Sequence, residues 1–255
     1  MRLLPGESII YFGDTARVPY GTKSDRTVRA FAWEDSLFLL NHKVKMIVVA
    51  CNTVSAVALD ELDRYLNIPV IGVIQPGAEA AAKATRSGRI GVIGTQATVD
   101  SRAYERAIQN IRPDAVVAST ACPLFVPLVE EGWTEGEVPE LIARRYLIPL
   151  LDAGIDTLIL GCTHYPLLKP LLAKILGKSV ILIDSAEVIA IQVQLILENM
   201  LALNPSKHGD RRFFVSDYPR RFEELGKRFL GEPVNSITVA EPWKHYNPFS
   251  FPVQP

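Results

Sequence analysis

Short apolar runs alternate along the chain with longer segments in which apolar residues recur at helical spacing. The runs are rich in β-branched residues and predict strands at Ser8–Phe12, Met46–Ala50, Val70–Ile74, Arg89–Ile93, Ala115–Ala118, Thr157–Leu160, Val180–Ile183 and Arg212–Val215. The segments between them predict helices at Arg26–Asn41, Ala56–Leu66, Ser101–Asn110, Glu137–Ala153 and Ala186–Asn204. Strands that alternate with helices are typical of α/β proteins whose parallel sheets are covered on both faces.

Two of the predicted strands run into a cysteine and a turn that carries threonine. Cys51 stands in VVACNTVS and Cys162 in LILGCTHYP, and the next strand begins 19 residues after the first cysteine and 18 after the second. Upstream, Ile9–Phe12 and its loop precede the first cysteine as Ala115–Ala118 and its loop precede the second. This order predicts two related halves that each present one thiol at the carboxyl end of a strand, where such folds bind ligands.

The two halves differ at their beginnings. Residues 89–115 supply a strand, a helix and a loop ahead of the second half, whereas no equivalent stands ahead of Ile9. We therefore expect that the first half lacks one strand–helix unit and that the natural start lies upstream of Met1. Because an unpaired sheet edge and an open apolar face are costly, we expect low stability or low activity of the chain as given.

A pair of thiols suits proton transfer at carbon. A thiol has a pKa near 8.5 that falls at a helix N-terminus, so it can accept or donate a proton near neutral pH. Two thiols on opposite sides of one carbon can remove a proton from one face and deliver one to the other, which is racemisation or epimerisation. Asn52, Thr53 and Thr163, with the backbone N–H groups at the two helix starts, are suited to hold carboxylates.

Composition narrows the possible partners. The chain is 48% hydrophobic and 22% charged with a net charge of −1, which gives no electrostatic case for a nucleic-acid or membrane partner. No apolar run approaches the roughly 18 residues of a spanning helix, and we expect no signal peptide. Three widely spaced cysteines form neither a disulfide framework nor a CxxC metal site, so we expect reduced thiols, a cytoplasmic location and no metal.

Several motifs together resemble one family. GDTARVPYG (13–21), ACNT (50–53) and GCTHYP (161–166) resemble signatures of the aspartate/glutamate racemase family, and IGVIGTQATVDS (90–101) and ACPLFVPLVEEGW (121–133) look like further family segments. The resemblance runs from about Glu7 to about Ala190, and GCTHYP with VPYG favours the glutamate branch. It implies racemisation of L-glutamate to D-glutamate for peptidoglycan synthesis, with no cofactor and no metal.

The resemblance also implies roles for individual residues. Cys51 and Cys162 resemble the two acid/base thiols, the first serving the D-enantiomer and the second the L-enantiomer, and His164 resembles the histidine that assists Cys162. Glu130 matches an acidic residue near the site, and Asp14 either lines the site or bonds within its own loop. The positions that match substrate holders are Tyr20, Gly21, Asn52, Thr53 and Thr163. The Asp-Ser-Gly turn with which the family opens, and whose aspartate assists the first thiol, has no counterpart in this sequence.

The repeat and the resemblance predict two doubly wound parallel-sheet domains, related by pseudo-two-fold symmetry, with the active site in the cleft between them. One domain would comprise residues 1–74 plus 185–255 and carry Cys51, and the other would comprise residues 75–184 and carry Cys162. A homodimer is possible. Two alternatives stay open: a family racemase that acts on aspartate or a hydantoin, and a catalytically impaired relative that acts through protein binding.

Overall fold

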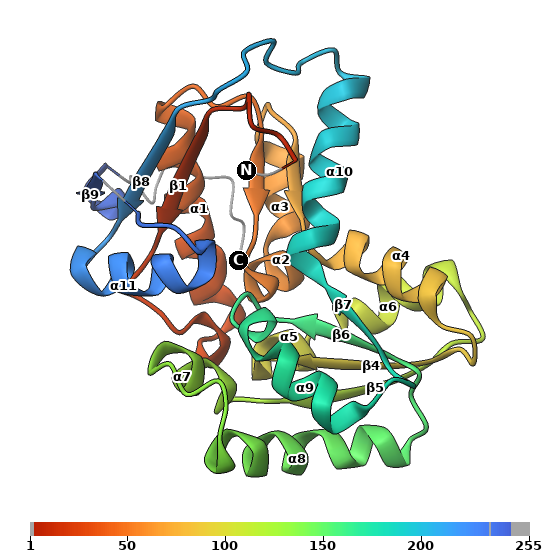
Figure 1. Cartoon of the computed structure of the whole chain (residues 1–255). Coiled ribbons are helices and arrows are strands. Elements are labelled where there is room, and N and C mark those ends of the chain that lie inside the picture. The colour runs from red at the N-terminus through yellow and green to blue at the C-terminus, as the bar shows by residue number, and fades with distance from the viewer. Residues whose placement is uncertain (1–2, 235, 246–255) are drawn as a thin grey trace.

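The computed structural model describes residues 3–234 and 236–245, and within these ranges nine strands form three sheets in which all neighbours run parallel (Figure 1). The eight predicted strands are all present to within a few residues, and β9 is an addition. The strand bounds are β1 Ile9–Gly13, β2 Ile47–Val49, β3 Val70–Gly72, β4 Arg89–Gly94, β5 Val116–Ala121, β6 Thr157–Gly161, β7 Ile181–Asp184, β8 Arg211–Val215 and β9 Ile237–Val239.

The structure has more helices than the sequence predicts. Their bounds are α1 Asp25–Asn41, α2 Asn52–Val57, α3 Leu59–Tyr65, α4 Ile74–Ala84, α5 Gln96–Asp100, α6 Ala103–Ile111, α7 Phe125–Glu130, α8 Glu137–Asp152, α9 Lys169–Leu176, α10 Ser185–Asn199 and α11 Pro219–Leu230, with the 3₁₀ turns η1 Tyr20–Thr22, η2 Tyr165–Leu168 and η3 Pro242–His245. The helix predicted at 56–66 is two helices, because the backbone at Ala58 leaves helical geometry with φ −125°. Helices α4, α5, α7, α9 and α11 lie outside the predicted helix ranges.

The second half is a four-stranded sheet in the order β5-β4-β6-β7 with helices on both faces (Figure 1). On one face, Phe125 of α7, Leu147 of α8 and Leu172 of α9 belong to one buried cluster. On the other face, Ala78 of α4 and Ile108 of α6 belong to another. Burial on both faces explains why strand β6 is apolar along nearly its whole length.

The first half holds two smaller sheets, β1-β8-β9 and β2-β3. Helices α1, α2 and α3 share a buried cluster with the β2-β3 sheet, centred on Val28, Trp33 and Leu62. By the internal repeat, β1 corresponds to β5 and β2 to β6, and in the second half β4 lies between that pair. Within residues 3–234 and 236–245 no strand lies between β1 and β2, so the halves differ by one strand.

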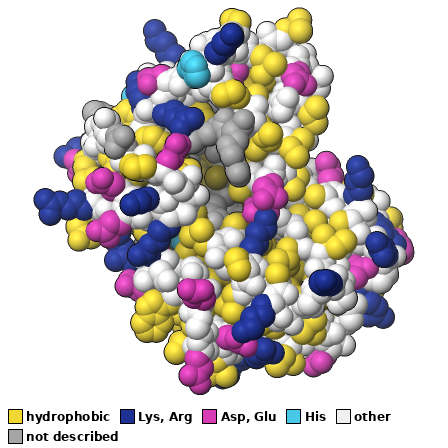
Figure 2. All heavy atoms as spheres, in the orientation of Figure 1, with side chains coloured by type: hydrophobic (Ala, Val, Ile, Leu, Met, Phe, Trp, Pro, Cys, Tyr) yellow, Lys and Arg dark blue, Asp and Glu magenta, His cyan; other side chains and the backbone are white. Residues whose placement is uncertain are grey.

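The surface carries charge of both signs. On the face shown in Figure 2, Lys and Arg side chains are interspersed with Asp and Glu side chains, in keeping with the net charge of −1. Among the described helices, none is long and apolar enough to cross a membrane.

Candidate active site

Cys51 occupies the junction between β2 and α2, as the residue immediately before the helix, and its side chain is half-buried. Burial raises the pKa of this thiol, whereas hydrogen bonds from the backbone N–H groups of Val54 and Thr53 oppose part of the rise. The N–H groups of a first helical turn have no partner within the helix, so they are available to a thiolate.

Cys162 follows β6 and is 6% exposed. Burial raises the pKa of Cys162 to about 12, the backbone N–H of His164 lowers it, and negative charge on Cys51 raises it again. Each thiol thus sits at a strand end with N–H groups directed at its sulfur, and charge on one sulfur affects the other. The two predicted acid/base thiols are therefore electrostatically coupled.

A chain of polar contacts leads from Cys162 to the surface. The Nδ1 atom of His164 lies 3.9 Å from the sulfur of Cys162 and 3.3 Å from the hydroxyl of Thr163, and its Nε2 lies 3.3 Å from Oε1 of Glu130. The hydrogen bond from His164 lowers the pKa of Glu130, and Arg221 on α11 adds to this at 3.5 Å. Because a carboxylate can only accept, Nε2 carries the proton, and in a neutral ring Nδ1 faces the thiol as an acceptor.

Three threonines join the two halves beside Cys51. The hydroxyl of Thr53 lies 2.9 Å from that of Thr95 and 3.4 Å from that of Thr98, which are themselves 3.0 Å apart. Thr95 is the N-cap of α5, just after β4. A methyl group on Gly21 would collide with the side chain of Thr95, so glycine permits the turn 20–22 to approach this cluster.

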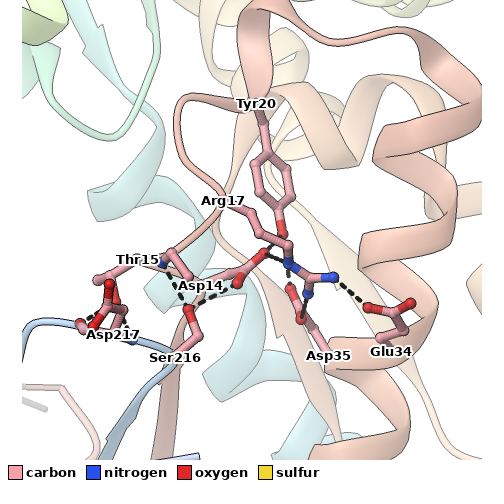
Figure 3. Close-up of polar contacts among 9 residues, drawn as sticks. Asp14, Thr15, Arg17, Tyr20, Glu34, Asp35, Ser216 and Asp217 are labelled. Carbon is pink, nitrogen blue, oxygen red and sulfur yellow. Dashed lines mark hydrogen bonds and ion pairs between the residues drawn. The ribbon is translucent and has the colours of Figure 1, made fainter. Parts of the chain in front are cut away.

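The loop after β1 is fixed by a buried ionic cluster (Figure 3). The guanidinium of Arg17 binds Asp14 at 2.7 Å and Asp35 at 3.0 Å and also pairs with Glu34, and the Tyr20 hydroxyl donates to Asp14 and lies 3.1 Å from Asp35. Burial raises the pKa of Asp35 well above its usual range, and the charge of Asp14 raises it further. The cluster fixes Asp14 and Tyr20 within the loop after β1, and the charge of Asp35 also raises the pKa of Cys51.

The chain is similar to known proteins over most of its length. The model of the Asp/Glu/Hydantoin racemase family matches residues 2–193. The chain belongs to this family. A glutamate racemase of Geobacter metallireducens is 54% identical over 238 residues, which are 93% of this chain and 88% of that protein. A glutamate racemase of Neisseria meningitidis is 51% identical over 241 residues, or 94% of this chain and 89% of its own.

Solved structures of the Asp/Glu/hydantoin racemase family agree with the fold. Glutamate racemase isoform RacE1 from Bacillus anthracis superposes with a TM-score of 0.91 at 42% identity, covering 94% of this chain and 90% of its own. Glutamate racemase from Francisella tularensis, solved in complex with D-glutamate, gives 0.90 at 40% identity, with 96% and 92% covered. The predicted α/β fold and family membership are confirmed, and the domain boundaries stay a prediction.

Some of the residues predicted for the racemase site are in contact in the structure. The structure brings Cys162, His164 and Glu130 into one chain of contacts. In a separate set of contacts, Thr53 and Gly21 both lie against Thr95. The structure also shows three polar side chains that sequence reasoning missed: Thr95, Thr98 and Tyr104, the last of which donates to Asn52 at 2.6 Å. The signal for the first two was the segment GTQAT, which follows a strand end just as CNT does. The roles of all these residues in this racemase chain stay a prediction.

Within the described ranges, no group of three or more His, Cys, Asp and Glu side chains is arranged to hold a metal ion.

Proposed function

We propose that this chain interconverts L- and D-glutamate through Cys51 and Cys162, without a cofactor, and so supplies D-glutamate for peptidoglycan synthesis. The observation that carries the proposal is the pair of electrostatically coupled thiols, each at a strand end with backbone N–H groups directed at its sulfur. The substrate follows from the relatives, because proteins about half identical over more than nine-tenths of the chain are glutamate racemases.

In the L-to-D direction, the Cys162 thiolate takes the α-proton, so the Cα–H bond breaks and an S–H bond forms. The electron pair left on Cα delocalises into the adjacent carboxylate, and Cys51 then gives its proton to the opposite face. The product state holds a Cys51 thiolate and a Cys162 thiol, which is the state that begins the reverse reaction. To restore the starting state, Cys162 must lose its proton and Cys51 must gain one from solvent, and His164 stands where its Nδ1 can take up the Cys162 proton.

The residues proposed to hold the substrate come from both halves of the chain. Thr53 and Gly21 meet through Thr95, and Thr163 lies beside His164. Hydroxyls, an amide and backbone N–H groups are the donors that carboxylates of glutamate require. Tyr20 contributes through its ring and backbone, because its hydroxyl is committed to Asp14.

Incubation with L- or D-glutamate in D₂O tests the reaction directly. We expect deuterium at the α-position together with loss of optical activity, whereas absence of both would exclude the proposal. Cys51→Ser and Cys162→Ser should each lower kcat/KM by about 10²–10⁴-fold, the usual worth of an acid/base group. Cys122→Ala is the matched control, because Cys122 is a fully buried core residue outside the proposed proton path. Wild-type racemisation by either serine variant would exclude a two-thiol mechanism.

The assembly and location are further parts of the proposal. We infer a homodimer in the cytoplasm, where its three free cysteines stay reduced. Support for association comes from α10 and the residues after it, where Ile191, Leu195 and Leu201 are exposed and hydrophobic side chains gather in Figure 2. Light scattering gives the mass in solution, and a monomer at micromolar concentration would contradict the inference.

A further inference from the structure

The side-chain amide of Asn52 is buried, and only its oxygen has a hydrogen-bond partner among the described residues. Asn52 is the first residue of α2, next to Cys51, and only 2% exposed. Its Oδ1 accepts a hydrogen bond of 2.6 Å from the Tyr104 hydroxyl, whereas its Nδ2 has no partner in the described part of the chain. A buried donor without an acceptor costs free energy, and such groups in native proteins call for an explanation.

The ring of Tyr104 is held between two glycines. This residue lies in the first turn of α6, is 2% exposed, and has Gly77 of α4 and Gly161 of β6 on its two ring edges. A methyl group on Gly77 would come within 3.1 Å of Cε1, and one on Gly161 within 3.2 Å of Cε2. Two glycines therefore form the slot that fits the ring, and the slot ends at Asn52.

The chemistry of the phenol sets the orientation of the amide. Burial raises the pKa of Tyr104 and charge on Cys162 raises it further, whereas a hydrogen bond with Ser185 lowers it by less, so the hydroxyl keeps its single proton at neutral pH. That proton is given to Oδ1 of Asn52, which fixes the amide with both Nδ2 hydrogens directed elsewhere. The group that completes this arrangement must be an acceptor, and a carboxylate is an acceptor without a proton of its own.

We propose that Tyr104 is a positioning residue, which orients the Asn52 amide so that Nδ2 donates to a carboxylate oxygen of the bound amino acid. This inference rests on the proposed racemase function. Tyr104 comes from the half that carries Cys162, and Asn52 from the half that carries Cys51. The bond therefore also aligns the two thiol-bearing loops at the substrate.

Tyr104→Phe removes the hydroxyl and keeps the ring in its slot. Without it, the amide can turn over, so we expect KM for both enantiomers to rise about tenfold, the worth of one hydrogen bond, with kcat changed less than threefold. Tyr146→Phe is the matched control, because Tyr146 packs on the far helix α8 against Phe125. It should leave both constants unchanged.

Two further measurements separate positioning from a structural role. In the Asn52→Ala background, Tyr104→Phe should add no further rise in KM, whereas a role in stability alone would add independently. In ¹⁵N NMR, the Asn52 side-chain amide signals, assigned by their loss in Asn52→Ala, should shift in Tyr104→Phe and on addition of D-glutamate to wild type.

The outcomes distinguish this inference from the proposed function. A wild type that racemises glutamate while Tyr104→Phe keeps its KM overturns the inference alone. A wild type that fails to racemise, but whose Asn52 amide signals shift with D-glutamate, overturns the function and supports the inference. If the Asn52 amide signals shift neither on addition of D-glutamate nor in Tyr104→Phe, the inference is overturned in every case.

Discussion

Glu130→Gln tests the chain of contacts behind Cys162. The substitution keeps the size of the side chain but removes the charge that lies 3.3 Å from Nε2 of His164. In the proposed reaction, His164 becomes an imidazolium when it takes the proton of Cys162. The carboxylate stabilises that cation, so its loss should raise the barrier for proton transfer at Cys162 and leave the Cys51 side unaffected.

The structure sets the size of this effect. Two unit charges 3.3 Å apart interact by about 1 kcal/mol in bulk water and by about 5 kcal/mol at an effective dielectric constant of 20. The side chains of His164 and Glu130 are 23% and 26% exposed, and Arg221 already neutralises part of the charge, so the lower end applies. We expect Glu130→Gln to raise the activation free energy by about 1.5 kcal/mol, which lowers kcat/KM roughly tenfold.

The assay follows glutamate by circular dichroism in both directions. Because the two enantiomers are equal in free energy, kcat/KM must fall equally in both directions. The side of the defect appears instead in deuterium isotope effects: the effect with [2-²H]-L-glutamate should rise, because its proton goes to Cys162, and that with [2-²H]-D-glutamate should fall. Glu131→Gln is the matched control, because Glu131 pairs with the same Arg221 at 3.0 Å but does not contact His164.

Two results would refute this reasoning. An unchanged kcat/KM in Glu130→Gln would mean that the carboxylate does not act on the imidazole during turnover. Equal losses in Glu130→Gln and Glu131→Gln would assign the effect to the general negative charge around Arg221 rather than to His164.

Two predictions concern stability and pH. Burial and the charge of Asp14 raise the pKa of Asp35, so the native state keeps a proton that the unfolded chain loses above about pH 4, and stability falls as pH rises from there. Asp35→Asn should therefore raise the unfolding temperature at pH 7, and a lower one would contradict this. Burial raises the pKa of Asp156, but hydrogen bonds from Thr85 and Ser87 lower it well below its usual range, so its contribution is present above about pH 4 and lost in acid. Asp156→Asn should cost about 1–2 kcal/mol at pH 7 and nothing below the lowered pKa, as followed by chemical denaturation.

The predicted strands could be found because each is a short run rich in apolar and β-branched residues, and in β4 and β6 burial on both faces demands apolar residues at successive positions. The missed helices lacked a helical pattern for physical reasons. Helices α5 and α7 have five and six residues, too few to show a period. Helix α4 contains Pro76 and Gly77, which read as a turn, yet proline is tolerated in a first turn and the glycine admits the ring of Tyr104.

The site was predictable where its residues share one segment and not where they meet across the fold. Cys162 and His164 stand two positions apart, and motif reasoning found both. Thr53 meets Thr95 across 42 positions and Asn52 meets Tyr104 across 52. Such pairs depend on how α2, α5 and α6 pack together, which no periodicity encodes.

The electrostatic coupling between the two thiols bears on the stoichiometry of the proposed reaction. Racemisation needs one thiolate and one thiol at the same time, and either a doubly ionised or a doubly protonated pair is idle. Burial makes each charge costly, and charge on Cys51 makes ionisation of Cys162 costlier still. The backbone N–H groups at each strand end offset part of this cost. The coupling therefore disfavours the doubly ionised pair, and in the proposed reaction a single charge passes from one sulfur to the other in each turnover.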